Sequence, residues 1–266
     1  MSSMFCYQCE QTAKGTGCTA QGVCGKAPET AALQDLLIHT AEGISQYASR
    51  ARKLGASHQP ADLFVVEALF TTVTNVDFDP ERVAEIIRRG ATMRDETKAV
   101  YEKACQDKGE EPEAIAEDAA ILPADTLEGM IQQGEAVTIQ KRIDALGSDV
   151  SGLQELVTYG LKGMAAYVDH AHVLGQDDDA VYAFIHEAMD FLAGNPSDVD
   201  ALVAMALKVG EANLKAMELL DAANTGTYGH PEPTQVRVTP VAGKCILVSG
   251  HDLRDLKMLL EQTEGK

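Results

Sequence analysis

The sequence repeats a helical pattern after 120 residues, and this repeat limits the possible folds more than any other feature. Leu33-Gln34-Asp35-Leu36-Leu37 resembles Leu153-Gln154-Glu155-Leu156-Val157. The same spacing continues through three stretches of helical periodicity, in Gly43 and Gly163, Tyr47 and Tyr167, Phe64 and Phe184, Val83 and Val203, and Gly90 and Gly210. We therefore expect a mainly α fold with a duplicated three-helix unit, roughly 29–104 and 149–224, within a helical domain over 29–226.

Local signals predict where these helices begin and end. The first helix should start at Pro28-Glu29-Thr30 and end at Gly55, and the second should span about 60–73. Asp79-Pro80-Glu81 is typical of a helix start, because Asp accepts bonds from free N–H groups and Pro suits the first position. Residues 105–148, between the two repeats, are less regular and suggest only short helical pieces.

The pattern changes after residue 226. Residues 227–240 form a linker rich in Gly and Pro, and the apolar run from Lys244 to Gly250 is typical of a buried strand. Asp252 can cap a helix that runs to about Gln262. Residues 241–266 would thus be the first strand and helix of an α/β, Rossmann-like domain. Because one strand cannot make a sheet, we expect the chain to be a fragment of a longer protein.

Four of the six cysteines, Cys6, Cys9, Cys18 and Cys24, lie within a loop over residues 1–28 that has no helical or strand periodicity. Four thiolates on a short Gly-containing loop can ligate either an iron–sulfur cluster or a zinc ion. A zinc ribbon usually has two Cys-x2-Cys knuckles, whereas only Cys6 and Cys9 form one here. The spacing favours iron–sulfur and leaves zinc, disulfides or unligated thiols as alternatives. Elsewhere, we expect a surface thiol at Cys105 and a buried apolar residue at Cys245.

Composition excludes several classes of function. The net charge of −19 argues against nucleic-acid binding, since phosphate recognition needs clustered Lys and Arg. An acidic surface can instead meet a basic electron donor, or simply keep the protein soluble. No apolar run is long enough to span a membrane, and no export signal begins the chain, so we expect a cytoplasmic protein. In a reducing compartment a disulfide scaffold is disfavoured.

Histidine gives one further candidate ligand. His251 directly follows the predicted strand, and open α/β sheets bind ligands at the carboxyl ends of their strands. A single histidine at such a position is more often structural, so both interpretations stay open. His170 and His172 face different directions on a helix, and we expect structural roles for both and for His39, His58, His186 and His230.

The cysteine segment resembles the N-terminus of hybrid-cluster (prismane) proteins of the hydroxylamine reductase type. The resemblance is carried by Met4 to Thr12, Gly17-Cys18, Gly22 to Lys26, Ala31 to Leu37 and Lys244 to Leu253. It runs from residue 4 to the last residue and covers only the N-terminal part of the family's sequence. The helical duplication agrees with the two three-helix bundles in the first domain of that family.

The resemblance implies specific ligands. Cys6, Cys9, Cys18 and Cys24 would ligate a cubane [4Fe-4S] cluster, at a spacing similar to the version from anaerobes and unlike the more widely spaced [2Fe-2S] version. His251 would ligate the second, hybrid iron–sulfur–oxygen cluster. The remaining ligands of that cluster, two Glu and several Cys, would lie beyond residue 266, so no catalytic residue is assigned here.

The resemblance also implies an activity. The longer protein would reduce hydroxylamine to ammonia and water, and also nitric oxide, with this chain supplying the cluster that relays electrons from a redox donor protein. The chain alone should be inactive. Two other interpretations remain, a stand-alone electron-transfer module and a zinc-stapled helical interaction protein.

Overall fold

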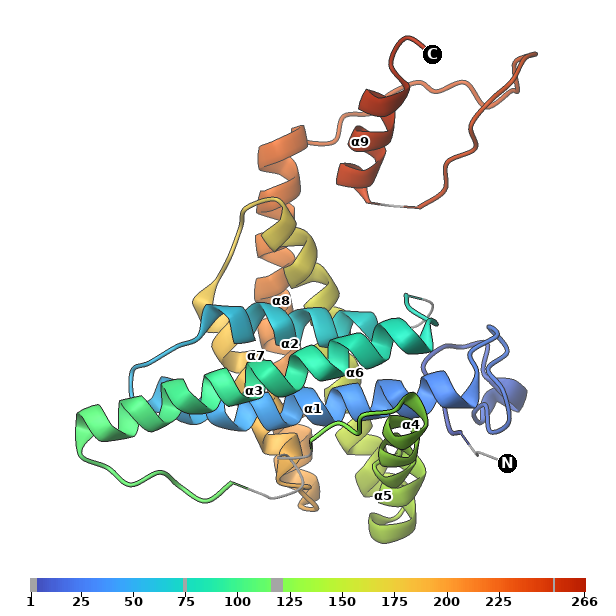
Figure 1. Cartoon of the computed structure of the whole chain (residues 1–266). Helices are drawn as coiled ribbons and strands as arrows, with labels where there is room; N and C mark the ends of the chain where they lie inside the picture. Colours follow the sequence, from blue (N-terminus) through green and yellow to red (C-terminus); the bar gives the residue numbers. More distant parts are fainter. Residues whose placement is uncertain (1–3, 74–75, 116–121, 251) are drawn as a thin grey trace.

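A computed structural model describes residues 4–73, 76–115, 122–250 and 252–266 (Figure 1). The fold is mainly helical, as predicted. The first unit consists of α1 (Pro28–Lys53), α2 (Gln59–Thr71) and α3 (Pro80–Lys108), and the second of α6 (Ser148–Val173), α7 (Asp179–Ala193) and α8 (Val199–Tyr228). Between them lie α4 (Leu127–Ala136) and α5 (Ile139–Leu146), and at the two ends lie a short 3-10 helix (Ala13–Gly15) and α9 (Leu253–Thr263). Within the described residues, no helix is long and apolar enough to cross a membrane.

The third helices of the two units differ in register from the sequence prediction. α1 and α6 begin 120 residues apart, whereas the capping residues of α3 and α8, Asp79 and Asp198, are 119 apart. Val83 is fully buried, and the buried residue at its position in α8 is Leu202, while Val203 is 42% exposed. Pairing Val83 with Val203 is therefore wrong, because the connection from α7 to α8 is one residue shorter than a constant spacing requires.

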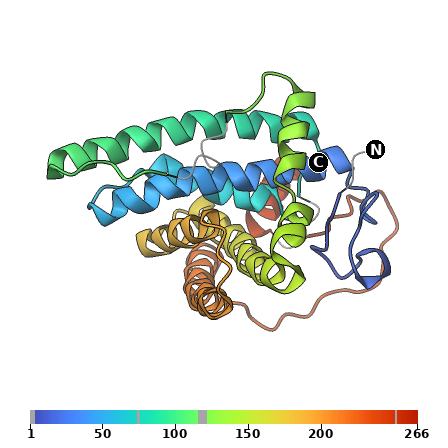
Figure 2. The same ribbon diagram turned by 90° about the horizontal axis from the view of Figure 1, so that it is seen from below.

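The two units interlock around one apolar core. α1 packs against α3 of its own unit and against α7 of the other, and α2 packs against α6. Figure 2 shows α1, α2 and α3 on one side and α6, α7 and α8 on the other, with α4 and α5 at one end of the contact. One contiguous cluster contains fully buried side chains of both units, among them Leu37, Ile44, Leu161 and Ile185. The main core is thus shared by both units.

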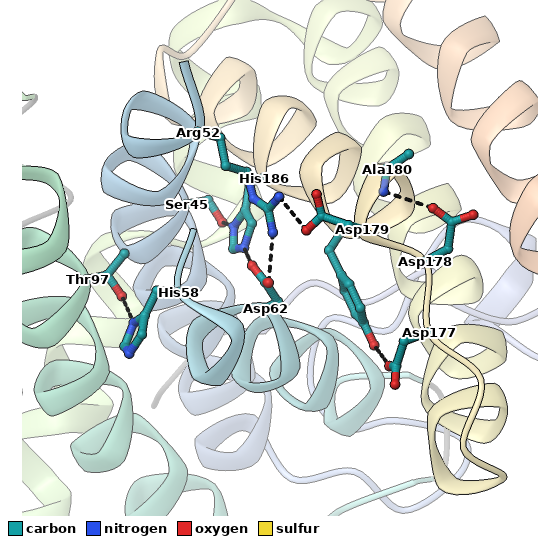
Figure 3. Close-up of polar contacts among 11 residues, drawn as sticks. Ser45, Arg52, His58, Asp62, Thr97, Asp177, Asp178, Asp179, Ala180 and His186 are labelled. Atoms are coloured by element: carbon teal, nitrogen blue, oxygen red, sulfur yellow. Dashed lines mark hydrogen bonds and ion pairs between the residues drawn. The ribbon is translucent and has the colours of Figure 1, made fainter. Parts of the chain in front are cut away.

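A buried polar network joins the units inside this core (Figure 3). His186 on α7 lies 3.0 Å from Ser45 Oγ through Nδ1 and 2.9 Å from Asp62 Oδ1 through Nε2. Arg52 donates to Asp62 Oδ2 at 2.7 Å and to the exposed Asp179 at 2.7 Å. Ser, His and Asp are the residue types of a hydrolase triad, but Ser45 and His186 are fully buried. The network is structural, as expected for His186.

The C-terminal segment departs from its prediction. α9 begins after Asp252, whose side chain accepts a hydrogen bond from the N–H of Asp255, as predicted. Residues 244–250 form no strand, however, and Leu247 is 92% exposed. An extended segment has no ladder to join when the structure holds no neighbouring strand for it. The predicted buried strand is therefore not formed in this chain, and His251 lies outside the described residues.

The two isolated cysteines are placed the opposite way from the prediction. Cys105 is 2% exposed and packs with Tyr101 and Ala51, whereas Cys245 is exposed. α3 continues to Lys108, and this places Cys105 on its last turns against α1. Cys245 is exposed because the described part of the chain forms no sheet that its segment could join.

Removing Asp62 should destabilise the fold. The substitution Asp62→Ala leaves the largely buried Arg52 guanidinium and His186 without their carboxylate. Breaking a buried pair in this way costs about 3–5 kcal/mol, so the urea midpoint of unfolding should fall markedly. Asp179→Ala is the matched control, because Asp179 bonds to the same Arg52 from an exposed position and should cost at most about 1 kcal/mol. Equal losses for both variants would contradict the structural role of the buried pair.

Candidate metal centre

The cysteine loop is held together by a short antiparallel contact of the backbone. The Cys6 N–H donates to Cys18 O at 3.0 Å, and the Cys18 N–H donates to Cys6 O at 2.7 Å. Met4 N–H donates to Thr19 O at 3.4 Å and extends the contact by one further bond. This pairing fixes the first and third cysteines opposite each other on neighbouring backbones.

The other cysteines lie in tight turns. After Cys9, the Thr12 N–H returns to Cys9 O at 3.2 Å, and the Ala13 N–H donates to Cys18 Sγ at 3.4 Å. Cys24 lies in a turn closed by the Gly22 N–H and Lys26 O at 2.9 Å. A Cβ at Gly22 would lie 3.0 Å from Lys26 Cβ and 3.1 Å from Cys24 Sγ, so a side chain there would crowd the sulfur in this turn. Cys18 is buried, Cys6 and Cys9 are half-buried, and Cys24 is exposed.

The four thiols suit a soft metal, although this conformation does not assemble a complete ligand set. In the described part of the chain, no three His, Cys, Asp or Glu side chains are grouped closely enough to hold a metal ion. None of the six cysteines forms a disulfide, and all six lie within the described residues. A sulfur that accepts a backbone N–H, as Cys18 does, is typical of iron–sulfur ligands, whose potentials depend on such bonds. The donor set therefore fits the predicted cluster, and the assignment of all four cysteines as ligands stays a prediction.

The residues between Cys6 and Cys9 attach the loop to the helical units. With its amide oriented to satisfy both partners, Gln8 donates to Thr72 O at 3.0 Å and accepts from Lys162 Nζ at 3.1 Å. Tyr7 stacks on Tyr159 of α6, with ring centroids 6.5 Å apart. Thr72 follows α2, and Lys162 lies on α6, so this knuckle contacts both units.

A charged cavity of about 260 Å³ lies behind the knuckle, where the units meet. Its lining includes three pairs of residues at equivalent positions of the repeat, Asp35 and Glu155, Ile38 and Thr158, and Glu42 and Lys162. The α4–α5 segment closes one side through Arg142, which forms an ion pair with Glu155. Because α1 packs on α7 and, reciprocally, α6 packs on α2, the two units are related by an approximate two-fold axis, and equivalent residues of both units meet at this cavity.

Burial changes the ionisation of the groups around this cavity. Burial first, and then the Glu155 carboxylate, raise the pKa of Asp35 to about 7. Burial lowers the pKa of the Lys162 amine, against the opposing effects of Glu155 and Asp35. The sequence repeat pairs Asp35 with Glu155 but does not predict that the two side chains line one cavity. The acid at both equivalent positions was the available signal.

Replacing Asp35 should change how stability depends on pH. The pKa of Asp35 is about 7 in the folded chain against an ordinary value of 3.8, so folding favours the protonated acid. Its contribution is present below about pH 4 and is lost as pH rises through about 7. Asn cannot ionise, so Asp35→Asn should gain stability relative to the parent chain over this window.

The measurement is urea unfolding of both chains at pH values across the window. Glu96→Gln, which removes an exposed carboxylate on α3, is the matched control and should run parallel to the parent chain. A constant stability difference between Asp35→Asn and the parent chain would contradict the raised pKa of Asp35.

Comparison with known proteins adds independent information. Residues 4–266 match the family model described as the Prismane/CO dehydrogenase family. A relative from Rhodospirillum rubrum named hydroxylamine reductase is 53% identical over 262 residues, which cover 98% of this chain and 48% of the relative. Relatives of the same name from Acidithiobacillus ferrooxidans and Methanocella arvoryzae are each 49% identical, and the matches cover 99% of this chain and 48% of each relative. The chain thus spans about half the length of the curated relatives it matches.

Proposed function

Because the chain belongs to the Prismane/CO dehydrogenase family, we propose that it is the N-terminal part of a hydroxylamine reductase and supplies its electron-entry centre. The whole protein would add two electrons and two protons to hydroxylamine and release ammonia and water. Nitric oxide would be a second substrate. The reaction would take place in the cytoplasm, with electrons from a redox donor protein.

The observation that carries this proposal is the Cys6, Cys9, Cys18 and Cys24 loop on a chain of this family. We assign these four thiolates as ligands of a [4Fe-4S] cluster, which when bound would accept and pass on one electron at a time. His251 would ligate a hybrid iron–sulfur–oxygen cluster whose other ligands belong to the rest of the longer polypeptide.

The surrounding residues would hold the loop and control its contact with water. The Cys6–Cys18 backbone pairing restrains two ligands, and the Ala13 N–H stabilises negative charge on Cys18 Sγ. Cys18 is buried, while Cys24 is exposed at the surface of the loop. We infer that the donor protein approaches the Cys24 side, where the distance to the centre would be shortest.

Anaerobic purification with metal analysis tests the centre. We expect about four irons and four sulfides per chain, with a broad visible absorbance that dithionite bleaches. Cys9→Ser should lose most of this iron, because it removes one thiolate ligand. Cys245→Ser is the matched control, since it removes an exposed thiol outside the loop and should leave the iron content unchanged.

Two results would contradict the assignment. One zinc per chain with no visible absorbance would favour the zinc-stapled interaction protein. An unchanged spectrum in Cys9→Ser would exclude Cys9 as a ligand, even if iron is present.

A hydroxylamine assay with a chemical reductant tests whether this chain only relays electrons and the rest of the longer protein is needed for the reaction. The chain alone should not consume hydroxylamine, because it lacks most ligands of the proposed hybrid cluster. Joining it to the unmatched half of the Rhodospirillum rubrum relative should restore consumption, measured as ammonia formed. Clear turnover by the chain alone would refute the view that this part only relays electrons.

A further inference from the structure

We propose that the groove between α6 and α8 is the docking site for one amphipathic helix, carried by the half of the longer polypeptide that the matched relatives possess. This inference rests on the proposed function to the extent that it takes that second half to be present. It concerns a surface of the second helical unit whose lining residues on α6 differ from those that line the charged cavity.

The groove is apolar and open. It has a volume of about 390 Å³, and most of its lining is aliphatic or glycine: Leu153, Leu156, Gly160, Val203, Ala206, Leu207, Val209, Gly210 and Asn213. Leu156 is 57% exposed and Leu207 is 67% exposed, and Leu214 and Met217 continue the exposed apolar surface along α8. A contiguous surface of this kind on a helical domain marks an interaction site more often than a free surface.

The first unit contains the same groove, but there it is filled. The positions of Leu153 and Leu156 correspond to Leu33 and Leu36 on α1, which are buried. α4 packs along α1 at this place and touches α3, and its Met130 is fully buried. The Leu36 position thus shows what happens to Leu156 when a helix occupies the groove.

The walls of the two grooves are built alike. In the first unit, a Cβ at Gly90 of α3 would lie 2.5 Å from Thr40 Cγ2 of α1. In the second, a Cβ at Gly160 of α6 would lie 2.6 Å from Val209 Cγ1 of α8. Thr40 corresponds to Gly160 in the repeat, and Gly90 corresponds to Val209. The glycine of this contact therefore lies on α3 in the first unit and on α6 in the second. In both units the first and third helices therefore approach closely at this position.

The packing of α4 in the first unit also indicates what kind of helix would bind in the groove of the second unit. Leu127, Met130, Ile131 and Gly134 lie one or two turns apart on one side of α4 and belong to or line the shared core. Gly134 is needed because a side chain there would overlap the Ala32 carbonyl. At the corresponding place of the second unit, a Cβ on Gly152 would meet nothing within 4 Å. We therefore expect a helix of about three turns with an apolar face and a small residue.

Within the described ranges, no helix of this chain lies in the groove. α9 contacts the end of α6, where Arg254 donates to Val173 O and Asp252 lies 3.7 Å from His170. α5 packs on α6 from the cavity side, through the Arg142–Glu155 pair. The matched relatives are about twice as long as this chain, so their second half is the source of an additional helix.

Thiol labelling at residue 156 tests the docking. The substitution Leu156→Cys is made in the 266-residue chain and in the same chain joined to the unmatched half of the Rhodospirillum rubrum relative. Alkylation of the peptide that contains residue 156 is followed by mass spectrometry. We expect at least about tenfold slower labelling in the longer polypeptide, because a covered thiol reacts only when the contact opens. Lys103→Cys, on the exposed side of α3, is the control and should label rapidly in the shorter chain.

A stability measurement provides the second readout. Leu156→Arg should leave the Tm of the 266-residue chain nearly unchanged, since the side chain is exposed there, and should lower the Tm of the longer polypeptide. Equal labelling in both polypeptides together with equal Tm effects would overturn the proposal. Concentration-dependent protection in the shorter chain alone would also overturn it, because the occupant would then be a second copy. Neither readout needs iron or turnover, so failure of the docking is distinguishable from failure of the proposed function.

Discussion

The structure depends on the placement of α1 between its own α3 and the α7 of the other unit. This arrangement gives the two units one shared core, so polar groups at their contact are removed from water and must find partners there. His186, Asp62 and Ser45 satisfy one another at one place, and Arg142 and Glu155 do so at another. The first set joins α1 and α2 to α7, so separating the units would break it, whereas the Arg142–Glu155 pair attaches α5 to α6.

The cysteine loop is built on this same contact. Gln8 reaches Thr72 O beside α2 and Lys162 on α6, while Lys26 donates to Gln34 on α1 at 2.6 Å. The loop itself has little regular structure apart from the Cys6–Cys18 contact and one 3-10 turn. Its conformation therefore depends on helices from both units. Ligand binding by the cysteines would in turn stabilise the contact, because metal binding and folding are coupled in such loops.

The sequence predicted most helices because each signal was local. Asp79 and Asp252 cap the helices they were expected to cap, and the apolar periodicity located α1 and α2 to within a few residues. The failures concerned residues whose environment comes from distant segments. Cys105 is buried because α3 continues past it against α1, and Leu247 is exposed because no strand within the described residues covers it. The proximity of Asp35 and Glu155 likewise follows from a symmetry axis that no local pattern contains.

The two units resemble each other more in the arrangement of their helices than in the burial and charge of equivalent side chains. Gly43 and Gly163 occupy equivalent positions of the repeat, yet Gly43 is buried while Gly163 is exposed with open space above it. Glu42 and Lys162 occupy equivalent positions with opposite charge, and only Lys162 contacts the cysteine loop. An exact two-fold repeat would place two like charges beside one another at the axis, at a cost that burial increases. The divergence of the copies thus gives the loop a different contact on each unit, through Lys162 on α6 and through the Lys26–Gln34 bond on α1.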